Sequence, residues 1–192
     1  MKGFIMSTEI ERKFIPNLYD EDLQCQLRAF TSKRTIIQAY FTQADDMNDI
    51  RVRIIENAGS FDRAFLTFKN RGHLVRKEFE FQIDQHKADE LFKLCVGTRI
   101  VKTATWFVFD DMKWRLDTFH NENAGLDLLE LEFPDADIAE DYEPPDWAVV
   151  EVTQCQKFYN GYLANKPFTM WTKSTRKKVK KILKGITIAG KF

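Results

Sequence analysis

Residues 8–15 read Thr-Glu-Ile-Glu-Arg-Lys-Phe-Ile, and this alternation decides the fold. Along an extended strand, side chains two positions apart point to the same face. Glu9, Glu11 and Lys13 therefore share one face, and Ile10 and Phe14 share the other. The stretch predicts a β-strand with one charged face and one apolar face.

Four further segments repeat this division. Their charged faces hold Arg51 and Arg53; Arg76, Glu78 and Glu80; Arg115 and Asp117; and Glu130 and Glu132. Such alternation most often marks a sheet with one face in solvent. Neighbouring like charges weaken that interpretation, because they repel one another unless adjacent strands supply partners. A charged surface that faces inward is the alternative.

The number of strands favours a closed sheet. Period-2 alternation predicts strands at residues 8–15, 36–42, 49–56, 64–70, 74–83, 98–109, 113–119, 127–134 and 148–153. Turn-forming sequences separate several of them, at Gly59, residues 70–72, Asp110-Asp111 and residues 121–125. Short connections indicate antiparallel neighbours, and closure removes exposed sheet edges. We expect a mainly β (α+β) fold, a closed antiparallel β-barrel with flanking helices.

Helical periodicity is confined to four segments. They are residues 20–30, a helix capped by Asp84 and ended by Gly97, residues 153–164, and residues 174–184 with Gly185 as the stop. The last helix has only Val179, Ile182 and Leu183 as an apolar stripe. We expect residues 1–164 to form one domain, and residues 165–192 to be a basic helical extension packed on it.

Composition points to a globular domain. Hydrophobic residues make up 44% and charged residues 30% of the 192-residue chain, and no apolar run approaches the roughly 20 residues of a membrane span. The apolar stretch within residues 1–6 is too short for a signal peptide, so we expect a cytoplasmic protein. Cys25, Cys95 and Cys155 lie far apart without metal-ligand spacing, which favours reduced thiols.

Charge is unevenly distributed although the net charge is zero. Of the 29 basic residues nine lie in residues 165–192, which hold no Asp or Glu, so residues 1–164 carry 20 basic and 29 acidic side chains. The simplest partner for the basic tail is this acidic body. The tail could instead cover one mouth of the barrel, or bind nucleic acid through sequence-independent phosphate contacts.

An inward orientation of the charged faces has a chemical consequence. The barrel interior would then hold clustered carboxylates beside clustered guanidinium and ammonium groups, and each buried ion costs several kcal/mol unless it is paired. Carboxylate clusters suit Mg²⁺ or Mn²⁺, and Arg/Lys clusters suit phosphoryl oxygens. The pattern therefore predicts a site for a metal ion and a polyphosphate.

The order of these motifs resembles the CYTH superfamily, also called triphosphate tunnel metalloenzymes. The resemblance begins with Glu-x-Glu-x-Lys at residues 9–13 and covers about residues 7–164. It continues with Gln38-Ala39-Tyr40, Arg51-Val52-Arg53, Thr67-Phe68-Lys69, residues 76–80, Lys102, Leu116-Asp117-x-Phe119, residues 130–133 and Glu151-Val152-Thr153.

The resemblance implies an eight-stranded antiparallel tunnel that binds a triphosphate along its axis, and a role for each matched residue. The implied metal ligands are Glu9, Glu11 and Glu132, with Glu130 beside them. The implied phosphate ligands are Lys13, Arg51, Arg53, Lys69, Arg76 and Lys102. Glu11, Lys13 and Glu132 carry the implied catalytic role, and Glu78, Glu80, Asp117, Glu151 and Tyr40 support these groups or a second metal site.

The chain departs from the family pattern in two places. Similar short bacterial members carry Lys-Thr-Arg where this chain has Lys102-Thr103-Ala104, so one phosphate-binding arginine is missing. Losing one charge-assisted contact costs about 1.5–3 kcal/mol. Members also carry Lys-Arg-Tyr where this chain has Gln156-Lys157-Phe158, which removes a hydroxyl and leaves Lys157 as a substitute cation.

The resemblance implies a metal-dependent triphosphatase that uses Mg²⁺ or Mn²⁺ to hydrolyse inorganic triphosphate to pyrophosphate and phosphate. Three alternatives stay open: a class IV-type adenylate cyclase, a nucleoside or thiamine triphosphatase, and a weakly active polyphosphate- or nucleotide-binding module, because Ala104 replaces the arginine. The expected partner is a small-molecule triphosphate and not a membrane. Nucleic acid is a less favoured partner that the basic tail keeps open, and both monomer and homodimer fit the sequence.

Overall fold

The computed structural model describes residues 4–41, 48–70 and 74–186. Its strands are β1 (Phe4–Ile15), β2 (Ser32–Tyr40), β3 (Asn48–Asn57), β4 (Ser60–Asn70), β5 (Val75–Ile83), β6 (Val96–Phe109), β7 (Met112–Phe119), β8 (Asp127–Glu132) and β9 (Val150–Glu151). Its α-helices are α1 (Glu21–Arg28), α2 (Gln85–Phe92), α3 (Ala136–Asp141), α4 (Asn160–Asn165) and α5 (Lys173–Ile182). Three 3₁₀ turns, η1 (Asn121–Asn123), η2 (Gln156–Phe158) and η3 (Phe168–Met170), complete the described elements.

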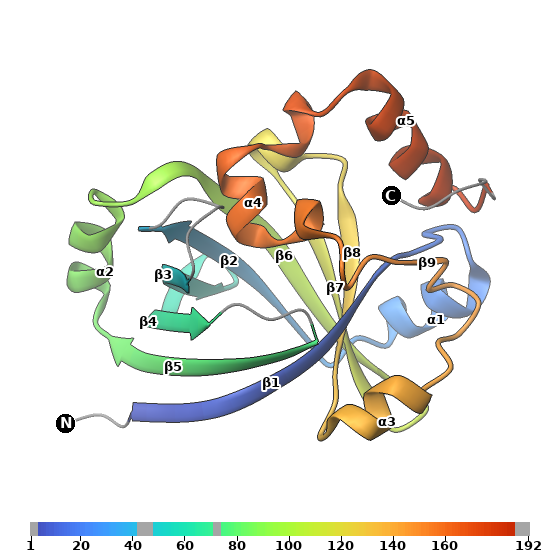
Figure 1. Ribbon diagram of the computed structural model, residues 1–192, viewed down its shortest axis with the longest axis horizontal. Helices are drawn as coiled ribbons and strands as arrows, with labels where there is room; N and C mark the ends of the chain where they lie inside the picture. Colours follow the sequence, from blue (N-terminus) through green and yellow to red (C-terminus); the bar gives the residue numbers. More distant parts are fainter. Residues whose placement is uncertain (1–3, 42–47, 71–73, 187–192) are drawn as a thin grey trace.

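Strands β1 to β8 form a closed antiparallel barrel, which confirms the predicted fold class. The order is β5-β4-β3-β2-β6-β7-β8-β1, and β5 pairs with β1 to close the ring. The long strand β1 runs along the whole barrel (Figure 1). Its first part pairs with β5, from Phe4 to Ile10, and its second part pairs with β8, from Glu11 to Phe14.

The ninth strand lies outside the ring and is shorter than expected. The segment predicted at residues 148–153 contracts to the two residues of β9. β9 pairs only with Phe14 and Ile15, the end of β1 beyond its pairing with β5. The free edge of β1 is too short there for a longer ladder.

Tight turns join neighbouring strands as expected. Ala58 and Gly59 both have positive φ between β3 and β4, and Asp110 and Asp111 both have positive φ between β6 and β7. Two successive residues in this region form the turn whose twist matches a hairpin. The predicted turn at residues 70–72 lies largely outside the described residues.

Two of the helix predictions need correction, and one helix was missed. The helix after Asp84 ends at Phe92 rather than at Gly97, which lies in β6 at φ +72°, where a Cβ would stand 2.6 Å from the Ala164 carbonyl oxygen. The helix predicted at residues 153–164 is broken into η2 and α4, because Tyr159 between them is extended. Helix α3 was not predicted; Asp135 caps it by accepting a hydrogen bond from the Ile138 amide.

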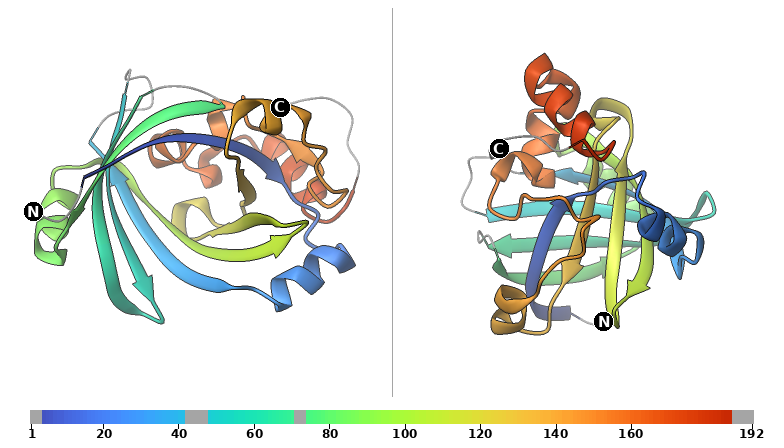
Figure 2. Two further views of the ribbon diagram at one scale, coloured as in Figure 1. Left: turned by 90° about the horizontal axis from the view of Figure 1, so that it is seen from below. Right: turned by 90° about the vertical axis from the view of Figure 1, so that its right-hand side faces the viewer.

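The apolar core surrounds the barrel and does not fill it. One cluster packs α1, α3 and Trp147 on β1, β7 and β8, a second packs α4, α5 and η3, and a third packs α2 on β3 and β4. Figure 2 shows α2 and α5 at opposite ends of the molecule. The barrel interior is therefore left to the charged faces. None of the described helices has the length and apolar character needed to cross a membrane.

Candidate active site

A cavity inside the barrel is lined by side chains from all eight strands, and every strand except β2 contributes charged groups to it. It is lined by seven acidic residues (Glu9, Glu11, Asp49, Glu78, Glu80, Glu130 and Glu132) and seven basic residues (Lys13, Arg51, Arg53, Lys69, Arg76, Lys102 and Arg115). Ser7, Thr8, Ile36, Gln38, Tyr40, Tyr159, Asn160 and Gly161 complete the wall. The alternation found along each strand thus becomes an inner charged surface.

Three carboxylates meet on one side of this cavity. Glu9 and Glu11 are two positions apart on β1, and the register of β1 with β8 sets Glu132 directly opposite Glu11. One ligand oxygen from each of the three lies within 4.8 Å of the others. Glu11 is 4% exposed, whereas the side chain of Glu132 is 63% exposed. Oxygen donors at this separation fit a hard divalent cation.

Basic side chains hold the two buried carboxylates of this group. Arg76 Nη2 lies 3.1 Å from Glu9 and 3.2 Å from Glu11, and Lys69 Nζ lies 2.7 Å from Glu9. Burial raises the pKa of Glu9, but the positive charges of Lys69 and Arg76 outweigh it and lower the pKa to about 2. The pKa of Glu11 is also lowered, because Lys13 and Arg76 oppose its burial. Both side chains are therefore ionised at neutral pH.

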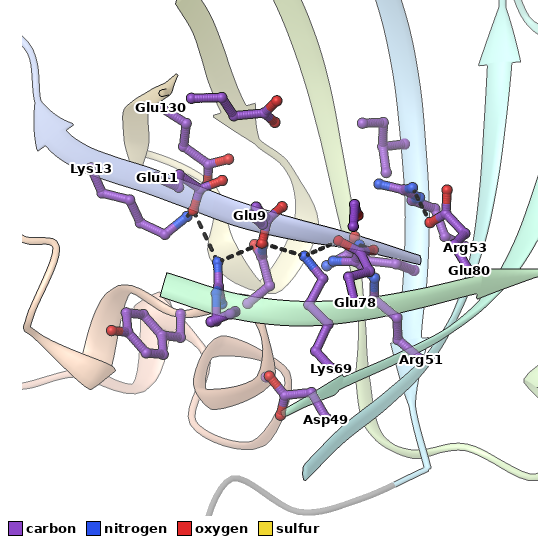
Figure 3. Close-up of a pocket in the computed structure, with 18 of the residues that line it drawn as sticks. Glu9, Glu11, Lys13, Asp49, Arg51, Arg53, Lys69, Glu78, Glu80 and Glu130 are labelled. Carbon is purple, nitrogen blue, oxygen red and sulfur yellow. Dashed lines mark hydrogen bonds and ion pairs between the residues drawn. The ribbon is translucent and has the colours of Figure 1, made fainter. Parts of the chain in front are cut away.

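A row of alternating charges continues from this group along the cavity. Lys69 Nζ also lies 3.0 Å from Glu78, Arg51 lies 3.2 Å from Glu78, and Arg53 lies 2.7 Å from Glu80. Figure 3 shows this row, with Lys13, Glu11 and Glu130 at one end and Arg53 and Glu80 at the other. Every cation in it contacts at least one carboxylate.

Lys13 is enclosed by acids at its end of the row. Its ammonium contacts both Glu11 and Glu130, and all three side chains are buried. Burial lowers the pKa of Lys13, and Glu11 opposes this effect. Glu130 also contacts Arg115, so two cations hold it beside the three-carboxylate group.

A second buried pair extends the cavity wall on β6 and β7. Lys102 contacts Asp117, which is completely buried, and Arg115 Nε lies 3.3 Å from the same carboxylate. Burial lowers the pKa of Lys102 to about 7, although Asp117 opposes this effect. Ala104 lies two positions from Lys102 on the same strand face and is paired in register with Asp117. Arg115 is paired in register with Trp106 and therefore lies diagonally across the ladder from position 104, where the arginine is absent.

The structure brings nearly all of the predicted site residues to the cavity. Thirteen of them line it, including Tyr40, whose hydroxyl accepts a hydrogen bond of 2.8 Å from Gln38. Burial raises the pKa of the Tyr40 hydroxyl. Asp117 lies behind the wall, where it contacts Lys102. The thirteen are Glu9, Glu11, Lys13, Tyr40, Arg51, Arg53, Lys69, Arg76, Glu78, Glu80, Lys102, Glu130 and Glu132.

Glu151 does not reach the cavity. It is paired in register with Phe14, which points outward, and it forms an ion pair with Arg12 at 2.7 Å on the outer side of β1. Arg12 also donates to the carbonyls of Ala139 and Tyr142 at 3.0 and 2.6 Å. This explains why one arginine stands among the apolar residues of β1.

Three ionisable lining residues were not among the predicted site residues. Arg115 could have been found from the sequence, because it shares a strand face with Asp117. Asp49 lies near the end of β3, and Tyr159 follows Phe158. Phe158 itself is buried in the core, while the Tyr159 ring lies 5.8 Å from the Arg76 guanidinium. A tyrosine hydroxyl is therefore retained, one position later than the family pattern suggests.

The substitute cation considered at Lys157 lies elsewhere. It lines a separate cleft beside Tyr162 and Trp171, outside the barrel. The segment after β9 thus contributes Tyr159 to the cavity wall, with the tyrosine hydroxyl donating to the Thr153 carbonyl at 2.7 Å, and Lys157 contributes no cation.

The cavity is electrically balanced without a ligand, which limits what it can bind. Seven carboxylates and seven cations line it, so an added polyanion would upset this balance. A polyphosphate would compete with the carboxylates for the cations, and each displaced carboxylate would then need a new positive partner. The arrangement therefore suits a polyphosphate and a divalent cation that enter together.

Comparisons with known proteins agree with this geometry. The chain is 33% identical to the inorganic triphosphatase of Nitrosomonas europaea over 158 residues, which cover 82% of this chain and 97% of that protein. It is 30% identical to the inorganic triphosphatase of Acetivibrio thermocellus over 165 residues, which cover 85% of this chain and 97% of that protein. The crystal structure of an inorganic triphosphatase superposes on this chain with a TM-score of 0.58 at 29% sequence identity. The superposition covers 82% of this chain and 95% of that one. No family model matches the chain.

Proposed function

Because this chain belongs to the CYTH superfamily, with the inorganic triphosphatases as its relatives, we propose that it hydrolyses inorganic triphosphate to pyrophosphate and phosphate with divalent metal ions. The observation that carries the proposal is the convergence of Glu9, Glu11 and Glu132 inside a closed barrel that is also lined by seven cations. Carboxylates alone would suit a metal store, and cations alone would suit an anion-binding protein. Their combination suits phosphoryl transfer.

Glu9, Glu11 and Glu132 are the residues that would hold Mg²⁺ or Mn²⁺. An ion held by these carboxylates would supply the positive charge that offsets the negative charge developing on the phosphate in the transition state. Glu132 is the most accessible of the three, and its nearest cation, Arg115 Nη1, is 4.0 Å away. Glu130 has Lys13 and Arg115 as partners, so its role is to position these cations rather than to bind metal first.

The basic residues would hold the triphosphate in line. Arg76 and Lys69 contact Glu9 from one side, and Arg51 and Arg53 extend the cation row along the cavity. When phosphoryl oxygens take over these cations, Glu9 and Glu11 lose their partners and become available to the metal. Substrate and metal therefore strengthen each other's binding, since each supplies the partner that the other displaces. Fixed charges that need no reorganisation are the main source of acceleration in such a site.

The direct test compares phosphate release by the parent protein and by Glu132→Gln. This change removes a proposed metal ligand that is mostly exposed, so it should leave the fold intact. We expect activity to fall about 100-fold or more, as for loss of one electrostatic contact in a preorganised site. Glu143→Gln, an equally conservative change at an exposed position, should be as active as the parent. Equal rates for parent and Glu132→Gln would reject the metal site.

A substrate panel and a binding measurement distinguish this function from the cyclase, the other triphosphatases and the binding module. Triphosphate, ATP and thiamine triphosphate are assayed with Mg²⁺ and with Mn²⁺, and cyclic AMP is measured beside phosphate. We expect inorganic triphosphate to be the preferred substrate and chelation of the metal to stop hydrolysis. Calorimetry should also show that Glu132→Gln loses less in affinity for triphosphate than it loses in hydrolysis rate. The reason is that the cations that hold the substrate are unchanged.

A further inference from the structure

Helix α5 presents an exposed basic surface outside the barrel. Its apolar side, formed by Val179, Ile182 and Leu183, is buried against the core. Its basic side chains line a shallow groove together with Ile186. They are Lys173, Arg176, Lys177, Lys180, Lys181 and Lys184, which we call the α5 groove. The helix thus docks through its apolar stripe and leaves most of its cations outward. Figure 1 shows α5 outside the barrel.

The described residues supply no acidic partner to these six cations. In the described part of the chain, none of them forms an ion pair with a carboxylate within 4.0 Å, and Arg176 Nε is buried without a hydrogen-bond acceptor. The basic helix packs on the acidic body, the partner that the sequence suggested, but these residues make no ion pair with it in the described ranges. The helix is held by apolar contacts instead. A row of unpaired like charges is complementary to an extended polyanion.

An aromatic cleft adjoins the N-terminal end of α5. Its lining consists of Lys157, Tyr162, Lys166, Met170, Trp171, Thr172 and Thr175, which we call the Trp171 cleft. Thr172 caps α5 by accepting a hydrogen bond from the Thr175 amide, and Arg176 of the α5 groove follows directly. The cleft and the groove are therefore adjacent in sequence, at the first turn of α5.

Trp171 is held rigidly in this cleft. Its indole N–H donates a 2.9 Å hydrogen bond to the Lys166 carbonyl, and its ring contacts Phe158 and Phe168 at centroid distances of 5.3 and 5.2 Å. Lys166 Nζ lies 5.4 Å from the Tyr162 ring, so a cation and an aromatic ring share the cleft. A fixed ring beside cations is the arrangement that binds an unpaired base next to its phosphate.

We propose that the α5 groove and the Trp171 cleft form a binding surface for single-stranded nucleic acid. The groove contacts successive phosphates, and the cleft stacks a base against Trp171. Inorganic polyphosphate or an anionic lipid surface would use the cations but would leave the aromatic cleft without a role. RNA and DNA share the chemistry required. The groove and the cleft have no lining residue in common with the barrel cavity, so this inference does not depend on the proposed hydrolysis.

The test measures fluorescence anisotropy of labelled oligouridine and oligothymidine, each of about 12 nucleotides and with a 5′-hydroxyl end, against the full chain. We expect saturable binding whose affinity falls steeply with salt, with a log–log slope of about −3 to −4 for four to six phosphate contacts. Lys177→Glu/Lys181→Glu should weaken binding at least about tenfold. The matched control Lys33→Glu/Lys113→Glu makes the same charge change at exposed positions on β2 and β7 and should bind like the parent.

The role of the cleft is tested separately with two variants of Trp171. Trp171→Leu keeps apolar bulk but removes the ring, and should weaken binding about 5- to 100-fold without changing the salt slope. Trp171→Phe should retain most of the affinity. Triphosphate hydrolysis serves as a check that each variant is folded.

Several results would overturn the proposal. One is the absence of saturable binding at low salt, and another is equal weakening by the two double variants, which would indicate unspecific attraction. A third is a pair of results found together. Inorganic polyphosphate competes as strongly as unlabelled oligouridine at the same phosphate concentration, and Trp171→Leu binds with the affinity of the parent. That result would reduce the surface to a polyanion site without base recognition.

Discussion

The barrel cavity and helix α5 contain the same kinds of basic residue in opposite circumstances. In the cavity every one of the seven cations contacts at least one carboxylate, and most are buried. On α5 six cations have no acidic partner among the described residues, and all of them except the half-buried Arg176 are exposed to solvent. Solvation makes the difference, because a buried ion requires a protein partner and an exposed one has water. Buried cations are therefore part of an internal balance, and exposed ones are available to a partner molecule.

The strongest way to break the cavity's balance is to remove a carboxylate at its centre. Glu11→Ala leaves Arg76 with one acidic partner and deprives Lys13 of one of its two. We expect the free energy of unfolding to fall by about 3–5 kcal/mol, because a buried charge loses its compensation. Hydrolysis should be lost as well. Urea denaturation of both proteins measures the first effect, and an unchanged midpoint would show that these cations do not need Glu11.

Arg115 offers a second way to sharpen the comparison, inside the cavity. It lies beside the position where the family pattern has an arginine that Ala104 replaces. We expect Arg115→Ala to lower activity about 10- to 100-fold, as for loss of one charge-assisted phosphate contact. Ala104→Arg should change activity by less than about threefold and cost about 1–3 kcal/mol, because Ala104 is fully buried. A large gain in turnover from Ala104→Arg would show that Arg115 does not fill the missing role.

The pH dependence of triphosphate binding distinguishes a buried cation from an exposed one, because burial lowers the pKa of a lysine. Burial lowers the pKa of Lys102 to about 7. Phosphate contact favours the charged form, so binding raises this pKa and takes up a proton above pH 7. Metal-free triphosphate affinity should therefore fall as pH rises from 7 to 8, by up to about tenfold from this group. Lys102→Arg stays charged and should lose this part of the pH dependence; identical profiles for the two proteins would contradict the assignment.

The smallest effect is expected on α5. Lys177→Ala/Lys181→Ala removes two exposed cations that have no acidic partner in residues 4–41, 48–70 and 74–186. The free energy of unfolding should change by less than about 0.5 kcal/mol, because exposed charges contribute little to stability. Thermal denaturation of the parent and the variant measures this. A loss of several kcal/mol would mean that these lysines hold the helix in place.

The site could be predicted where local geometry decides it. Glu9 and Glu11 share a face because they are two residues apart, and so do Arg51 and Arg53. Their meeting with Glu132 depends on the register of β1 against β8, for which the sequence gives no direct signal. The family resemblance supplied that pairing in advance.

Long-range contacts explain where the predictions failed. Glu151 follows the alternation of its strand, yet it points outward because β9 pairs with the end of β1 outside the ring. The tyrosine expected at position 158 is found at position 159. Tyr159 is extended and interrupts the predicted helix there. Neither feature is visible in the periodicity of a single segment.

The sequence by itself determined the strands, their charged faces and the residue types of a metal–polyphosphate site, since these follow from the period-2 geometry of the backbone. The tertiary structure decided which faces turn inward, which carboxylate meets which cation, and which cations remain without a partner. The physical reason is that ring closure and helix docking set the distance between charges far apart in the chain, and that distance, together with burial, fixes how strongly they interact.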